Sequence, residues 1–134
     1  MADTIKINFD EIYGAWRGYL LENSKAKHFG VLFDPSKKAE FPYANLALVG
    51  HPTGGQDLEA NEMSVTLTFD TEAYINNKEY GTLLNIDQAS ADFFIGLGFE
   101  RVGTSPMTRV SNTVSRITSR FTLDNYTGKF LHEL

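Results

Sequence analysis

The sequence contains no cysteine, which excludes disulfides, thiolate metal sites and a cysteine nucleophile. Its three histidines, His28, His51 and His132, lack the close spacing to one another or to carboxylates that metal-binding motifs show. No apolar run approaches the roughly 20 residues that cross a bilayer, and the first residues do not form a signal peptide. We therefore expect a soluble chain, made in the cytoplasm, that binds neither a membrane nor a metal ion.

Basic residues are also in the minority. Twelve Lys and Arg stand against seventeen Asp and Glu, which gives a net charge of −5. This is the wrong sign for a protein that is held to nucleic acid by counterion release. Stable DNA binding is therefore not expected.

Apolar and aromatic residues are plentiful. Apolar residues make up 42% of the 134 positions, and aromatic residues make up 13%. A chain of this size and composition buries enough surface to fold without disulfides or metal ions and is not intrinsically disordered. We expect a single domain over residues 1–134.

The N-terminal part predicts an amphipathic helix. Asn8 and Glu11 have the spacing of a capping box, and the helix is expected to end near Asn23. Gly14 and Gly18 within it either mark a face that another backbone approaches closely or are simply tolerated. The apolar stripe of this helix consists of Phe9, Ile12, Trp16 and Leu20.

Strand patterns follow. His28–Phe33 and Tyr43–Val49 are short strand-like segments bounded by turn residues. Met63–Phe69 alternates strictly between apolar and hydroxyl side chains, which is typical of a sheet with one covered and one wet face. A helix is expected to cover that sheet.

The second half predicts another helix and more strands. The helix begins near Lys78 and stops at Gly96 and Gly98, with Asp87 as a candidate cap for a restart inside it. Phe99–Val102 then reads as a strand. The order predicts an α+β fold, with a mostly antiparallel sheet of four to five strands packed against two helices.

The Thr- and Ser-rich run Thr108–Thr122 also reads as a strand. Its apolar parity changes between Val114 and Ile117, and a β-bulge would restore one buried face. A short last strand is predicted over Tyr126–Leu131.

Candidate functional residues are few. Asp57, Glu59 and Glu62 form either a solvated acidic loop or a binding element on a rigid sheet. Arg116 and Arg120 share a parity with Thr118, which places two cations on one strand face. They are either solvated or form an inter-subunit ion pair with the acidic loop. No catalytic constellation or cofactor motif is found, so we predict a protein that is not an enzyme and holds no cofactor.

The middle of the chain carries the pattern Phe41-Pro42-Tyr43-Ala44-Asn45-Leu46-Ala47-Leu48-Val49-Gly50. A polar loop with Asp57-Leu58-Glu59 and the alternating strand to Phe69 come next. This section resembles the lambda-type phage tail terminator proteins. In that family a helix, a Phe-Pro-led strand, an acidic loop and an alternating strand are followed by a helix and a closing hairpin.

The resemblance implies a structural role in the virion. Such proteins form a ring, typically a hexamer, that caps the head-proximal end of the tail tube, stops its polymerisation and joins tail to head. The implied partners are other copies of the chain, the major tail tube protein and the head connector protein. DNA meets the ring only in transit through the lumen. The expected location is the head–tail interface of the virion, after assembly in the host cytoplasm.

A cyclic ring needs two different patches on each subunit. By layout, we predict one interface at a docking loop and another on a sheet face. The docking-loop residues are His51, Asp57, Glu59 and Glu62, and the sheet-face residues are Arg116 and Arg120.

Two alternatives remain from the sequence. One is another head–tail connector or completion protein of the same virion, which would bind a different neighbour. The other is a small α+β ligand-binding or enzymatic domain, which would need a buried polar pocket with perturbed titratable groups.

The docking-loop assignment yields a first prediction. Replacing Asp57, Glu59 and Glu62 with Asn, Gln and Gln removes three negative charges and keeps the side-chain volumes. We expect weaker binding to tail tubes or to other copies, measured by co-sedimentation. Undiminished binding would assign the three carboxylates to ordinary solvated surface.

Overall fold

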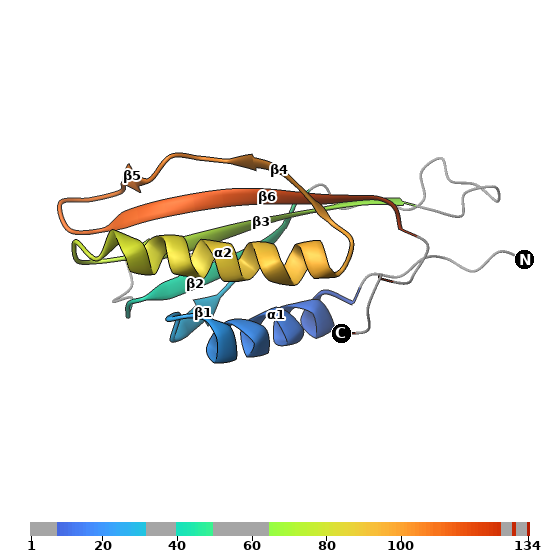
Figure 1. The fold of residues 1–134 in the computed structure, drawn as a ribbon, viewed down its shortest axis with the longest axis horizontal. Coiled ribbons are helices and arrows are strands. Elements are labelled where there is room, and N and C mark those ends of the chain that lie inside the picture. The colour runs from blue at the N-terminus through green and yellow to red at the C-terminus, as the bar shows by residue number, and fades with distance from the viewer. Residues whose placement is uncertain (1–7, 32–39, 50–64, 127–129, 131–133) are drawn as a thin grey trace, which may run out of the picture.

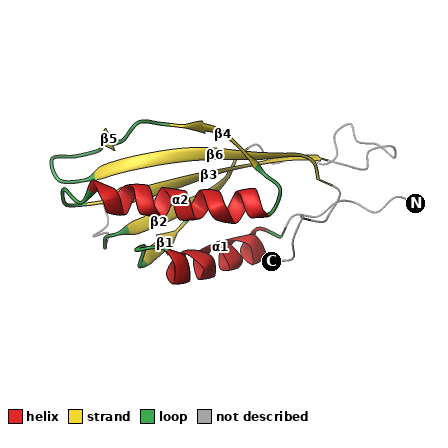
Figure 2. Ribbon diagram, viewed as in Figure 1, coloured by secondary structure: helices red, strands yellow, loops and turns green. Residues whose placement is uncertain are grey.

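The computed structural model describes residues 8–31, 40–49, 65–126, 130 and 134. They form two helices and a six-stranded sheet in the order β1-β2-β3-β6-β4, with β5 pairing to β6. Both helices cover the same face of the sheet (Figure 1), and Figure 2 shows the resulting helix and strand layers. The bounds are α1 Phe9–Asn23, β1 His28–Gly30, β2 Tyr43–Val49, β3 Val65–Ile75, α2 Tyr80–Gly96, β4 Glu100–Thr104, β5 Thr108–Arg109 and β6 Ser115–Tyr126.

Helix α1 confirms the prediction for the N-terminal part. The Asn8 side chain accepts a hydrogen bond from the Glu11 backbone N–H at 3.1 Å, so Asn8 is the N-cap. The buried stripe consists of Ile12, Trp16 and Leu20. Trp16 is fully buried, and its indole Nε1 donates to Ser90 Oγ of α2 at 3.0 Å. This bond satisfies the only polar atom of the indole and links the two helices.

Helix α2 ends as the glycines predict. Gly98 has φ 106°, a conformation that favours glycine. Its N–H donates to Ile95 O at 3.0 Å and the N–H of Phe99 donates to Phe94 O at 3.0 Å, which is the Schellman pattern. The helix is continuous from Tyr80 to Gly96, so the predicted restart at Asp87 is wrong.

Asp87 lies in the middle of α2, and its side chain is only 8% exposed. Ser119 Oγ of β6 donates to Asp87 Oδ1 at 2.6 Å, and Arg101 Nη2 of β4 donates to Oδ2 at 2.9 Å. The Arg101 guanidinium also stands over the Phe121 ring, 5.7 Å from its centroid. Asp87 is therefore a bridge between the helix layer and the sheet. Its carboxylate binds side chains of β4 and β6 and does not cap a helix.

The centre of the sheet is antiparallel. β3 pairs with β2 on one side and with β6 on the other, and among the described strands only the short β1 pairs in parallel, with β2. The alternation predicted to end at Phe69 continues to Ile75, and Leu67, Ala73 and Ile75 are buried as well. Met63, the predicted start, lies outside the described residues, and β3 begins at Val65.

The predicted bulge between Val114 and Ile117 is wrong. The N–H of Val110 donates to Val114 O at 2.8 Å, so the chain turns between β5 and β6. The parity changes because the run reverses direction and contributes two strands. This division and the short β1 raise the sheet to six strands, and the α+β class is confirmed. The predicted last strand falls largely outside the described residues, since β6 ends at Tyr126.

The core is rich in aromatic rings. Phe94 of α2 lies 5.4 Å from Phe69, 5.1 Å from Phe99 and 5.1 Å from Phe121 between ring centroids. Burying each such ring stabilises the fold by about 1.5–3 kcal/mol. The ring cluster thus holds α2 against the strands β3 and β6, on which the surfaces described below are built.

The Asp87 bridge yields a stability prediction. Asp87→Ala leaves Ser119 Oγ and the partly exposed Arg101 guanidinium without their carboxylate. We expect a loss of about 3 kcal/mol in the free energy of unfolding, near the lower end for breaking a buried pair. Urea unfolding measures it. Asp92→Ala is the control, because Asp92 is exposed on the same helix and binds only Gln88 among the described residues. Equal losses in both variants would contradict the bridge.

Candidate functional site

The described residues contain neither a cluster of metal ligands nor a membrane-spanning helix. Within the described residues, no group of three or more His, Asp or Glu side chains is gathered to hold a metal ion. Neither helix in this part of the chain is long and apolar enough to cross a bilayer. The candidate sites are surface features of the sheet and the helices.

The face of the sheet away from the helices carries a ladder of charges. Arg116 and Arg120 lie on this one face of β6, as their parity predicted, opposite Tyr74 and Asp70 of β3. Arg120 binds Asp70 through Nε to Oδ1 at 2.8 Å and through Nη2 to Oδ2 at 3.0 Å. This hydrogen-bonded carboxylate raises the pKa of the Arg120 guanidinium. The bidentate geometry fixes both side chains on the sheet surface.

The ladder continues toward β2. Arg116 Nη1 stands 3.9 Å from Glu72 Oε2, and Asn45 Nδ2 of β2 donates to Glu72 Oε1 at 3.0 Å. Both arginines are thus balanced by carboxylates of their own chain. Their predicted role in a subunit or tube contact stays a prediction.

Tyr74 is buried within this ladder and is only 3% exposed. The pKa of its phenol is raised to about 12, mainly by burial and also by the Glu72 carboxylate, while Arg116 partly offsets the rise. The Tyr74 ring meets Tyr43 of β2 edge-on at 5.9 Å between centroids. The outer sheet face is therefore an ordered polar and aromatic surface.

The four residues of the predicted docking loop, His51, Asp57, Glu59 and Glu62, lie outside the described residues. Their assignment to an interface remains a prediction from the sequence. The other surfaces that the structure describes are on the helix side.

A second surface was missed by the sequence reasoning. Tyr80 and Leu84 lie one turn apart on α2, and they are 39% and 49% exposed. Met107 and Val110, which flank β5, are 45% and 40% exposed. These four residues and Arg109 define the α2–β5 surface. The spacing of Tyr80 and Leu84 was the available signal, but only the fold brings Met107 and Arg109 beside Tyr80.

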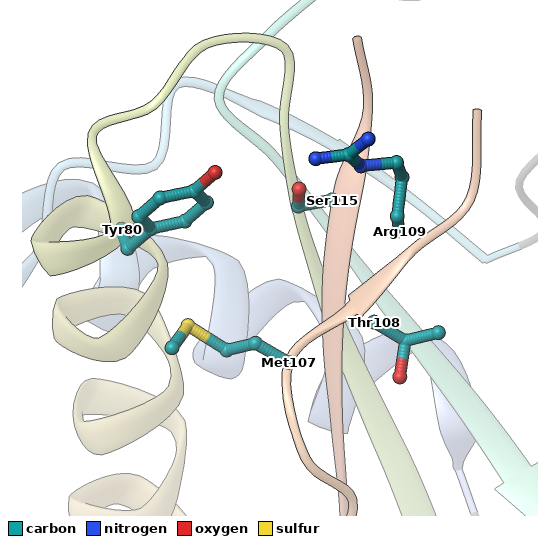
Figure 3. A pocket seen from close by; sticks show the side chains of 5 residues that line it. All are labelled: Tyr80, Met107, Thr108, Arg109 and Ser115. Carbon is teal, nitrogen blue, oxygen red and sulfur yellow. The ribbon is translucent and has the colours of Figure 1, made fainter. Parts of the chain in front are cut away.

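A pocket of about 240 Å³ opens within this surface. Its lining is Tyr80, Met107, Thr108, Arg109 and Ser115 (Figure 3). In this view the Tyr80 hydroxyl, the Ser115 hydroxyl and the Arg109 guanidinium lie at one end of the pocket, and the Met107 thioether lies at the other. Thr108 Oγ1 donates to Pro106 O at 3.0 Å, which braces the β5 backbone. Donors at one end and an apolar wall at the other suit an anionic group with an apolar stem.

A shallower groove of about 420 Å³ separates the two helices. Gly14 and Gly18 of α1 and Phe93 of α2 are among the residues that line it. A Cβ atom at Gly14 or Gly18 would meet nothing within 4 Å in the described part of the chain. Among the described residues, therefore, no other backbone approaches Gly14 or Gly18 closely, which was one of the two interpretations of these glycines.

Comparisons with known proteins add no relative to this picture: no family model matches the chain, and no curated protein matches it.

The buried phenol yields a pH prediction. Unfolded tyrosine ionises near pH 10, whereas folded Tyr74 keeps its proton to about pH 12. The folded state therefore binds more protons in this window, and the free energy of unfolding falls as the pH rises through it. We expect Tyr74→Phe to remove this part of the decline in urea unfolding measured against pH. Glu72→Gln should lower the pKa of Tyr74 in a tyrosinate absorbance titration, and an unchanged titration would contradict the role of Glu72.

Proposed function

We propose that this protein is a phage tail terminator: an assembly protein whose ring caps the head-proximal end of the tail tube, stops its polymerisation and joins tail to head. The resemblance in the middle of the chain supports the proposal, and the α+β layout agrees with it. The observation that carries it is the pair of dissimilar surfaces described above. One is the charge ladder on the outer sheet face, and the other is the apolar α2–β5 surface on the helix side.

Two dissimilar surfaces are what a cyclic ring requires. In a ring each subunit offers one patch to the copy ahead and another to the copy behind, so the contacts are heterologous and close by rotation. Clustered exposed apolar side chains mark protein contact sites more often than free surface. The exposed Tyr80 and Met107, which line one pocket with Arg109, make the α2–β5 surface the contact candidate on the helix side of the described residues.

The charge balance also suits the proposal. The net charge of −5 opposes a tight grip on DNA, so DNA would pass through the lumen without being held. The arginines of the sheet face do not alter this, because Asp70 and Glu72 balance them within the chain.

The proposal is tested by polymerising the cognate tail tube protein with and without this chain and viewing the tubes by electron microscopy. We expect tubes of limited length that carry a cap at one end. Tubes whose length does not change, together with a stable ring on the head portal, would favour a connector protein instead. Tubes whose length does not change, together with a melting temperature that rises when a small molecule is added, would favour a ligand-binding domain.

A matched pair of variants sharpens this experiment. Leu84 and Leu21 are similarly exposed, at 49% and 46%, but Leu84 belongs to the α2–β5 surface and Leu21 lies on α1. Leu84→Glu should reduce capping, whereas Leu21→Glu should leave it unchanged. Equal capping by both variants would remove the α2–β5 surface from the proposal.

A further inference from the structure

The arginines of this chain differ in how their charge is balanced. All five are described, and four have a partner: Arg17 stands over the Phe29 ring at 5.4 Å, Arg101 binds Asp87, Arg116 faces Glu72 and Arg120 binds Asp70. Arg109 has no ion-pair or hydrogen-bond partner among the described residues. Its charge is therefore available to a group outside this part of the chain.

The surroundings of Arg109 specify the chemistry of that group. In the view of Figure 3 the Tyr80 and Ser115 hydroxyls lie toward the same end of the pocket as the guanidinium. Helix α2 begins at Tyr80, so its partially positive end lies at the pocket as well. A guanidinium fork with two hydroxyl donors matches a carboxylate, which accepts several hydrogen bonds at once. The Met107 wall accommodates the apolar stem of an acidic side chain.

We propose that this pocket receives an acidic side chain from residues 57–62 of a second copy of the chain. The inference rests on the proposed function, because it names the contact that joins neighbouring subunits of the ring. The argument is charge complementarity. Copies with a net charge of −5 repel one another, and a contact that sets an unbalanced cation of one copy against carboxylates of the other offsets this repulsion.

The chain itself supplies suitable carboxylates. Asp57, Glu59 and Glu62 lie within six consecutive residues, and no Lys or Arg interrupts them. Arg116 and Arg120 are less suited to meet them, since Glu72 and Asp70 already balance those charges. Arg109 offers an unbalanced charge and a pocket in the same place.

The apolar rim of the pocket strengthens such a pair. Tyr80 and Met107 line the pocket with Arg109, and they are 39% and 45% exposed. When a second copy covers them, water leaves the rim and the ion pair lies in a medium of lower dielectric constant. Tyrosine, methionine and arginine are residue types that protein interfaces are enriched in.

A charge-swap experiment tests the contact. The pocket variant is Arg109→Glu, and the loop variant combines Asp57→Lys, Glu59→Lys and Glu62→Lys. Each variant alone brings like charges together, so we expect its dissociation constant for self-association to rise by about tenfold or more. A mixture of the two brings opposite charges together at both kinds of contact, and we expect assembly to return. Sedimentation velocity at low ionic strength measures both, and circular dichroism confirms that each variant is folded.

Two further variants make the test specific. Lys25→Glu makes the same change of charge beyond the end of α1 and should leave self-association unchanged. Arg109→Gln removes the charge without reversing it and should show an intermediate effect. Because the pair is ionic, added salt should weaken wild-type self-association more than that of Arg109→Gln.

The outcomes separate this inference from the proposed function. If wild type caps tubes and Arg109→Glu associates normally, the contact is wrong and the proposed function stands. If wild type associates through Arg109 but does not limit tube length, the contact stands and the proposed function is wrong. An Arg109→Glu variant that associates but no longer caps tubes would assign the pocket to the tube protein and overturn the contact. A wild type that stays monomeric both alone and at tube ends would overturn it too.

Discussion

The carboxylate of Asp87 is the interaction on which the α2–β5 surface depends. It reaches from the middle of α2 to Ser119 of β6 and Arg101 of β4, so one side chain fixes a helix to two strands. Ser119 Oγ also lies 3.2 Å from Thr104 Oγ1, which ties the end of β4 to β6. Ion pairs of this kind are strong only when each partner is also held by other contacts. Here the Phe121 ring beneath Arg101 supplies one of them.

The consequence extends beyond β4 to the β5 hairpin. The N–H of Ser105 donates to Thr118 O at 2.8 Å, and the N–H of Thr118 donates to Ser105 Oγ at 3.0 Å. The segment between β4 and β5 is thus held to β6 by the backbone, directly after the part that Asp87 anchors. Arg109 and Met107 therefore take their places beside Tyr80 because α2 and β6 are fixed relative to each other. The outer sheet face depends on different bonds, so the two surfaces are built independently.

The sequence predicted the elements better than their partners. The N-cap at Asn8, the strand Tyr43–Val49 and the stop at Gly98 rest on signals within a few residues, and all three are confirmed. Asp87 was misread because its partners, Arg101 and Ser119, are distant in sequence or in another element, and a local capping rule cannot see them. A parity change likewise has two explanations, a bulge or a turn, and only the pairing of β5 with β6 decides between them.

The candidate sites show the same limit. Parity placed Arg116 and Arg120 on one face, but their carboxylates come from β3 through the register that sets Asp70 opposite Arg120. That register depends on tertiary pairing across the sheet. Arg109 gave no signal at all, because an exposed arginine in a Thr- and Ser-rich run is ordinary until the fold sets Tyr80 and Met107 beside it.

An arginine without an ionic partner among the described residues has a consequence for when a ring would form. One ion pair with a small apolar rim gives a weak contact between two copies of an acidic protein that repel one another in solution. At the end of a tube the copies would be held side by side, and the effective concentration of each pocket for the next loop would rise into the millimolar range. On the proposed function, the chain would stay dispersed while tubes grow and close into a ring only where a tube end assembles it.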